Sequence, residues 1–188
     1  MNNYVKYIII VAFANILLTR CDSATSSKND VFHMNISAGL TSLDPAFSKD
    51  QATMLCDNQL YNGLVQIDEQ LNVQPCIAKY WKISTDGLLY EFILRNDVYF
   101  HDHEKFENGK RRKVTAHDFV YSFNRLIDST VASTGGWLFN DKIDKSNPFT
   151  AINDTTFQIH LKTPFFPMLG MLTLQYCSVV PKEVADFY

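Results

Sequence analysis

Several features that define large protein classes are scarce in this sequence of 188 residues. Basic residues do not outnumber acidic ones (17 against 20, net charge −3), so the chain lacks the electrostatic footprint of a nucleic-acid-binding protein. The same balance argues against attachment to an acidic membrane surface. The longest apolar run, residues 7–18, is interrupted only by Asn15 and is too short to span a bilayer.

Cysteine is also scarce, because the chain has four and their spacing matches no metal site. One of them, Cys21, lies near the N-terminus, and the other three cannot all pair with one another. One disulfide and one free thiol are an option in an oxidising compartment. We interpret the three as core residues, since cysteine is among the most buried residue types: Cys56, Cys76 and Cys177.

The first 20 residues have the pattern of an export signal. Lys6 is the only charge before the run 7–18, whose length suits the apolar region of a signal peptide. The alternative is a buried N-terminal helix. Cys21 follows almost directly, and polar residues with nothing to pack come after it. The pattern resembles a bacterial lipoprotein signal, which predicts a signal peptide over 1–20, a lipidated Cys21 and a polar tether over 21–30. Arg20 departs from that pattern, so ordinary secretion stays open.

Apolar and aromatic residues are plentiful, at 46% and 13%, and allow a sizeable core. The stretch 75–100 predicts a β-hairpin, because apolar and polar residues alternate on both sides of Asp86-Gly87. Asp-Gly favours a tight turn, since Gly tolerates positive φ. A hairpin this aromatic needs cover from the rest of the chain.

Before the hairpin, the pattern predicts a strand over 31–36, a helix over about 49–61 and a short strand over 64–67. Ser48 is the expected N-cap of the helix, and Gly63 the expected residue after its end. Its expected apolar contacts are Met54, Leu55, Leu60 and Tyr61.

The clearest helix is predicted over 115–128. Thr115 is a good N-cap, and Asp118 completes a variant of the capping box. One apolar stripe is expected to be buried, namely Ala116, Phe119, Val120, Phe123, Leu126 and Ile127. The polar residues are expected to face water: His117, Asp118, Ser122, Asn124 and Arg125.

After that helix we expect a flexible break at 134–136 and a second hairpin over 151–162. A buried helix is predicted up to Leu174, then a strand over 177–180, then a helix that begins at Pro181.

The sequence shows no set of residues for catalysis. His101, Asp102 and His103 suggest a metal site, but a third ligand at suitable spacing is missing. The basic run 110–113 is interpreted as a solvated turn. No nucleophile–base pair is recognisable, so we expect neither an enzyme nor a cofactor.

A series of short motifs, in order, resembles the extracellular solute-binding proteins of family 5, the oligopeptide- and dipeptide-binding receptors of ABC importers. The resemblance covers residues 36–188. Its motifs are Ser42-Leu-Asp-Pro45, Leu60-Tyr-Asn-Gly-Leu-Val65, Pro75-x-Ile-Ala-x-x-Trp81-x-Ile-Ser84, Asp86-Gly-x-x-Tyr-x-Phe92, Leu94-Arg95-x-x-Val98-x-Phe100-His-Asp102, Thr115-Ala-x-Asp-Phe-Val-Tyr-Ser-Phe-x-Arg125 and Val180-Pro-Lys182.

The resemblance implies a mixed α/β fold, with residues 31–188 forming part of the first lobe of a two-lobe periplasmic-binding-protein type II fold that closes by a hinge. It implies a receptor in the cell envelope, facing the periplasm or the cell exterior and anchored to a membrane by lipid. The receptor would capture a peptide through its main chain. It would then deliver the peptide to an ABC transporter permease.

Two segments are the ligand-binding candidates that the resemblance implies. The first is the loop residues Lys49, Asp50 and Gln51, and the second is the aromatic stretch Trp137, Leu138 and Phe139. The alternatives are that the first segment simply starts a helix and that the second packs inside the lobe.

Two departures from the family matter. Asp102-His103 stands where the family has Asp-Gly, and a longer loop follows up to Lys113. Family members are also more than twice as long, so we expect an N-terminal fragment that lacks the second lobe. The alternatives are a truncated product that binds no ligand, a partner-binding module, or a receptor of the same fold for a nickel chelate, haem or a sugar.

Overall fold

The computed structural model describes Tyr4, residues 33–36 and residues 38–188. The chain divides into two units, residues 1–35 and residues 36–188, and the second contains every element that follows. Apart from Tyr4, the predicted signal peptide, Cys21 and the predicted tether lie outside the described residues. The strand predicted over 31–36 lies there in part, and its described residues, 33–36, form no strand. None of the helices in the described part is both long and apolar enough to cross a membrane.

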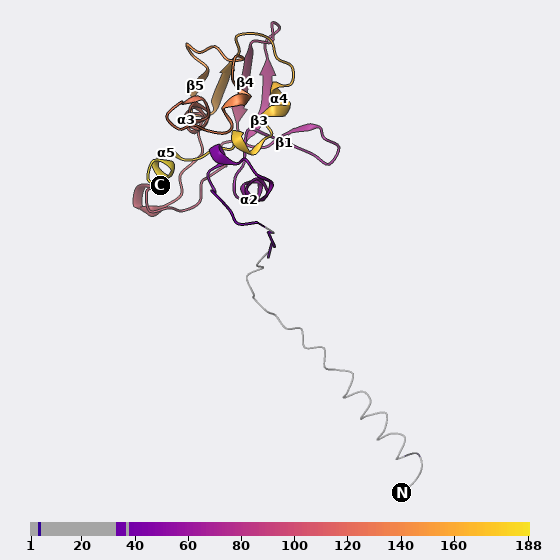
Figure 1. The fold of residues 1–188 in the computed structure, drawn as a ribbon, viewed down its shortest axis with the longest axis vertical. Helices are drawn as coiled ribbons and strands as arrows, with labels where there is room; N and C mark the ends of the chain where they lie inside the picture. The colour runs from indigo at the N-terminus through magenta and orange to yellow at the C-terminus, as the bar shows by residue number, and fades with distance from the viewer. Residues whose placement is uncertain (1–3, 5–32, 37) are drawn as a thin grey trace. The chain divides into compact units, whose positions relative to one another are not determined.

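An antiparallel sheet of four strands, in the order β3-β4-β6-β5, forms the frame of residues 36–188 (Figure 1). Its strands are β3 (Ala78–Ile83), β4 (Leu89–Leu94), β5 (Phe149–Asn153) and β6 (Thr156–His160). Both predicted hairpins are confirmed. Trp81 pairs with Phe92 across the first hairpin, and Gly87 takes the positive φ of 69° that its turn needs. A second sheet pairs β1 (Val65–Ile67) with β2 (Val73–Pro75).

Helix α3 (Ala116–Ile127) packs against β5 and β6 and closes the core. Phe123 is the centre of an aromatic cluster, with ring centroids 5.4 to 6.0 Å from those of Phe119, Phe139, Phe149 and Phe157. The predicted helix is confirmed. The prediction that all its polar residues face water is wrong, because Asp118 and Ser122 are buried.

Helix α2 (Gln51–Leu60) differs from the prediction at both ends and in its buried face. Asp50 is the N-cap, because its carboxylate accepts the Thr53 N–H at 2.9 Å, while Ser48 is buried away from that position. The helix buries Thr53, Cys56 and Asp57, and the predicted contacts Leu55 and Leu60 are exposed.

Gly63 does not end α2 as predicted, because the chain leaves the helix through an extended Tyr61. Gly63 instead pairs with Ser178 in a single β-bridge, where an added Cβ would lie 3.1 Å from the Cys177 carbonyl oxygen. Its lack of a side chain allows this close approach of two backbones.

The last part of the chain is less regular than predicted. The predicted buried helix is reduced to α4 (Met168–Met171), and the strand over 177–180 is replaced by η4 (Gln175–Cys177) and that bridge. The Val180 N–H bonds to the Ser122 side chain instead of to a strand. Short 3-10 turns η1 (Pro45–Phe47), η2 (Glu107–Gly109) and η3 (Gly136–Leu138) and helix α5 (Lys182–Ala185) complete the described elements. The three described cysteines are free thiols.

Candidate functional site

A cleft of about 760 Å³ opens between four segments of the chain. Its walls come from residues 42–47, 60–62, 98–106 and 179–188. Most of the lining is apolar or aromatic, and Asp44 and residues 101–103 add charged and polar groups. An apolar concavity with few polar groups is the usual form of a binding site, so this cleft is the first candidate.

The side chains of α3 hold two of these walls in place. Arg125, near the end of α3, donates to both carboxylate oxygens of Asp44 at 3.0 and 2.5 Å. The hydrogen bonds to Asp44 raise the pKa of Arg125, although its partial burial acts in the opposite direction. Asp44 also accepts the Ala46 N–H and so caps η1. This pair therefore fixes the wall 42–47 against the core.

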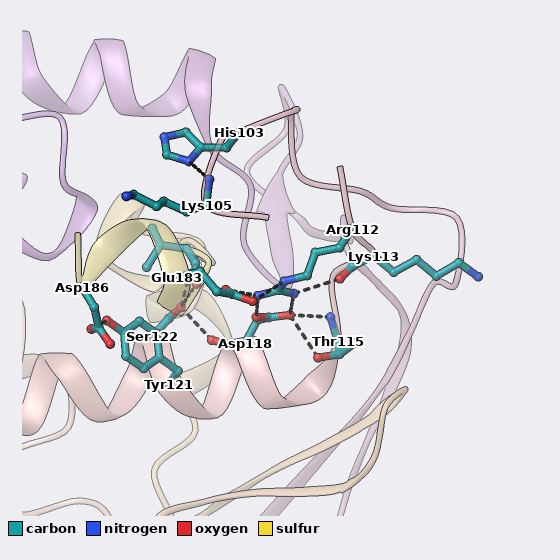
Figure 2. Close-up of polar contacts among 11 residues, drawn as sticks. His103, Lys105, Arg112, Lys113, Thr115, Asp118, Tyr121, Ser122, Glu183 and Asp186 are labelled. Atoms are coloured by element: carbon teal, nitrogen blue, oxygen red, sulfur yellow. Dashed lines mark hydrogen bonds and ion pairs between the residues drawn. The ribbon is translucent and has the colours of Figure 1, made fainter. Parts of the chain in front are cut away.

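Ser122 and Tyr121 hold the opposite wall, residues 179–188 (Figure 2). The Ser122 hydroxyl accepts the Val180 N–H at 2.9 Å and lies 2.7 Å from the Asp118 carbonyl oxygen, to which it donates. The Tyr121 hydroxyl donates to Asp186 at 2.5 Å. Burial, and then the bond to Asp186, raise the pKa of Tyr121 well above its ordinary value.

The first predicted ligand segment, residues 49–51, lies at the start of α2. Lys49 and Gln51 are exposed. Asp50 is engaged in capping, and its bonds to the Thr53 N–H and hydroxyl lower its pKa. Lys49 and Gln51 are therefore the members of this segment with side chains available to a ligand.

The second predicted segment is divided between the core and the surface. Leu138 and Phe139 are 1% and 0% exposed, and Phe139 belongs to the aromatic cluster. Trp137 is 51% exposed on the same turn, η3. Gly135 precedes this turn, and an added Cβ there would lie 2.5 Å from the Tyr176 ring, so close packing fixes the position of Trp137. Only Trp137 of this segment presents its side chain to solvent.

Hydrogen bonds join the loops that precede these two segments. The Ser133 hydroxyl donates to the Ala46 carbonyl oxygen at 2.6 Å, and the Thr134 hydroxyl approaches the same oxygen at 3.5 Å. Ala46 belongs to η1, which leads into residues 49–51, and Ser133 lies just before η3. These hydrogen bonds therefore join the residues just before the first candidate segment to the residues just before the second.

The residues 101–103, suggested by sequence as a metal site, shape a loop. The Asp102 carboxylate accepts the Arg111 N–H at 2.8 Å, and a His103 ring nitrogen accepts the Lys105 N–H at 3.2 Å. Within the described residues, no three His, Cys, Asp or Glu side chains gather with the geometry of a metal site.

Sequence reasoning missed the buried carboxyl group of Asp57. Neither carboxylate oxygen has a hydrogen-bond partner within the described residues, nor does the nearby Ser48 hydroxyl. Burial raises the pKa of Asp57, and the nearby Ser48 acts in the opposite direction. An acidic residue on a short helix is normally expected to face water, so the sequence pattern gives no sign that Asp57 is buried.

Comparison with known proteins identifies a family and several relatives that this chain resembles. Residues 72–188 match the family model for bacterial extracellular solute-binding proteins, family 5, middle region. The chain is 30% identical over 192 residues to the dipeptide-binding protein of Lactococcus lactis, covering 95% of this chain and 33% of that protein. It is 27% identical over 202 residues to heme-binding protein A of Haemophilus influenzae, covering 96% and 37%.

Solved structures agree in fold. The periplasmic binding protein DppA from Helicobacter pylori, in complex with the peptide STSA, superposes with a TM-score of 0.68 at 30% identity, over 78% of this chain and 30% of that one. HbpA2 from Haemophilus parasuis superposes with a TM-score of 0.69 at 29% identity, over 80% and 31%. The chain spans about a third of the length of these relatives. It has the mixed α/β fold of type II periplasmic binding proteins, and it belongs to the bacterial extracellular solute-binding proteins of family 5.

Proposed function

We propose that this chain forms part of a receptor that captures peptides outside the cytoplasmic membrane and delivers them to an ABC transporter permease. The observation that carries the proposal is the shared fold with the Helicobacter protein, whose structure holds a peptide. The relatives by sequence also include dipeptide-binding proteins. In this function the chain binds and releases its ligand and catalyses no reaction.

The ligand contacts proposed for this chain are the residues with exposed side chains in the two candidate segments, Lys49, Gln51 and Trp137. None of these three residues lines the cleft of about 760 Å³, so they form a candidate site separate from it. Asp50 contributes by fixing the start of α2, and Leu138 and Phe139 by supporting Trp137 from the core. An extended peptide gains affinity from main-chain hydrogen bonds, and pockets select its side chains. A rigid exposed Trp suits the second task, because an aromatic ring offers contact area at low entropic cost.

We further propose that residues 1–20 are a signal peptide, residues 21–30 a tether and residues 31–188 the lobe. Cys21 is proposed to carry the lipid that anchors the receptor in the cell envelope. Several acyl chains would hold it stably, since each buried methylene contributes about 0.8 kcal/mol and one chain alone is marginal.

The anchor is tested by expressing the chain with and without Cys21→Ala and separating membrane from soluble fractions. The unaltered chain should stay with membranes and show acyl mass, and the variant should not. Cys76→Ala serves as the matched control, because Cys76 is a free thiol of the lobe. Equal fractionation of the unaltered chain and Cys21→Ala, without acyl mass, would refute the anchor.

Haem is the second candidate ligand, because heme-binding protein A of Haemophilus influenzae matches 96% of the chain. To distinguish the two ligands, residues 36–188 would replace the corresponding part of the Lactococcus dipeptide-binding protein. Native mass spectrometry of this chimera would then identify the ligands that copurify with it. Peptide masses support the proposal, whereas bound haem with its Soret absorbance would favour the second candidate.

A further inference from the structure

Side-chain contacts from a neighbouring loop attach one wall of the cleft, residues 179–188, to the rest of the described chain. The helix of this wall, α5, buries no residue against the other described residues. Another wall of the cleft, residues 98–106, leads into the loop that ends at Lys113. Arg112, from that loop, reaches Glu183 of α5 (Figure 2). The Lys105 ammonium lies over the Phe187 ring, which follows α5.

Arg112 makes the main contact between the loop that follows residues 98–106 and the wall 179–188. Its Nε and Nη2 atoms donate to Glu183 at 2.8 and 2.6 Å, and its Nη1 and Nη2 atoms donate to Asp118 at 2.9 and 2.7 Å. Nη1 also donates to the Lys113 carbonyl oxygen at 3.1 Å. All five N–H groups of a guanidinium are thus used. Arg112 joins its own loop to the start of α3 on one side and to α5 on the other.

Two further contacts connect the same loop to the end of this wall. The Lys105 ammonium lies 3.5 Å from the centroid of the Phe187 ring, and the His103 ring meets Tyr188 edge-on at 6.1 Å. Cation–π contacts at exposed sites contribute modestly, so these contacts assist Arg112 and do not replace it.

The two carboxylate partners of Arg112 differ in exposure. The Asp118 side chain is 6% exposed and accepts the Thr115 N–H in the capping box of α3, so this partner is fixed in the lobe. The Glu183 side chain is 42% exposed, and salt therefore weakens its attraction to Arg112. Of the two ion pairs, the one to Glu183 is therefore the more open to solvent and to salt.

We propose that Arg112 and Glu183 form a lock at the edge of the cleft, and that breaking this ion pair frees α5 to move and opens the cleft. The Tyr121–Asp186 hydrogen bond keeps the end of this wall attached to α3, and the rest of the described chain stays folded. The hydrogen bond from Arg112 keeps the pKa of Glu183 below its ordinary value, so Glu183 remains charged at neutral pH. The lock therefore responds to salt and to competing charges. Local opening of this kind has a lower free energy than global unfolding.

Hydrogen–deuterium exchange of the full chain tests the lock, with Glu183→Gln compared against the unaltered protein at low salt and at 1 M NaCl. Glu183→Gln leaves the bond between Arg112 and Asp118 intact, so α3 keeps its cap. Lys182→Gln is the matched control, because it changes one charge on the same helix and Lys182 makes no side-chain hydrogen bond or ion pair with any described residue.

In Glu183→Gln, we expect the amides of residues 184–187 to exchange roughly three- to ten-fold faster, as for loss of a charge-assisted pair. The amides of residues 105 and 106 in the other wall should also speed up, and those of α3 and β4 should not change. Salt should shift the unaltered protein toward the variant. The proposal is wrong if Glu183→Gln exchanges like the unaltered protein, if Lys182→Gln has the same effect, or if α3 and β4 speed up equally.

Discussion

Arg125 and Asp44 lie 81 positions apart in the sequence and form an ion pair with two hydrogen bonds. Their side chains are 14% and 30% exposed, so the pair is partly withdrawn from water. Two of the sequence motifs meet in this contact, the Leu-Asp-Pro turn before α2 and the Arg near the end of α3. The pair gives both motifs a structural role, because it joins the turn before α2 to α3.

Arg125→Gln should destabilise the lobe by about 2–3 kcal/mol, because it leaves the Asp44 carboxylate without its partner in a partly buried site. Denaturant melts would measure the change, and a double-mutant cycle with Asp44→Asn would isolate the coupling. Arg95→Gln is the matched control, since the pair of Arg95 with Asp97 is exposed and should matter much less. Equal losses for Arg125→Gln and Arg95→Gln would mean that burial does not strengthen the first pair.

Phe123→Ala should cost about 3–5 kcal/mol, because it leaves a cavity at the centre of the aromatic cluster. Thr115→Ala should cost about 1 kcal/mol, because it removes the N-cap hydroxyl that donates to the Asp118 carboxylate at 3.0 Å. Melts of a soluble form from Lys28 onward would compare the two. Small and similar effects at both positions would show that the stripe of α3 does not stabilise the core.

The sequence predicted best where local pattern and local chemistry agree. The hairpin turn at Gly87 and the cap at Thr115 depend on neighbouring residues alone, and both are confirmed. The start of α2 was predicted wrongly, because Ser48 and Asp50 are both good caps and only the tertiary fold buries Ser48. The burial of Asp118 and Ser122 follows from contacts with Arg112 and Val180, which lie outside the helix pattern.

The candidate site was predictable only in part. Residue type suggested Trp137 and its two neighbours together, but only packing divides them into one exposed ring and two core side chains. The pairing of Arg112 with Glu183 joins positions 71 apart in the sequence. Periodicity reports which face of a helix is apolar, and it carries no information on such distant pairs.

Leu71→Gly should stabilise the protein by up to about 1 kcal/mol, since relief of left-handed strain outweighs the added chain entropy of glycine. Leu71 has a φ of 64° at the tip of the β1–β2 hairpin and is 79% exposed. Asp68 holds this tip by accepting the Gln70 and Asn72 N–H groups. Leu71→Ala removes the same exposed side chain but keeps the Cβ, so denaturant melts should show no comparable gain for it. An equal gain would assign the effect to lost apolar exposure.

Asp57→Asn should become increasingly stabilising as the pH rises. Burial raises the pKa of Asp57 above 3.8, so the folded state favours the neutral acid. This contribution to stability is complete below pH 3.8 and is lost as the pH rises through the raised value. The unfolding free energies of variant and unaltered protein should nearly agree at pH 3 and diverge toward pH 7. Glu69→Gln, at an exposed position, is the matched control. A difference for Asp57→Asn that does not change with pH would show that burial does not raise the pKa of Asp57.

Calorimetric titration with di- to pentapeptides is the most direct test that this chain is part of a peptide receptor. The 188-residue chain and the chimera with the Lactococcus protein would be titrated side by side. Association costs on the order of 4–15 kcal/mol of lost freedom, which one part of a binding site does not recover. We predict no saturable heat from the chain alone and saturable binding by the chimera, weakened by Trp137→Ala but not by Glu69→Gln. Tight binding by the chain alone would show that residues 36–188 hold the whole site. A folded chimera that binds no peptide would contradict the assignment of this chain to a peptide receptor.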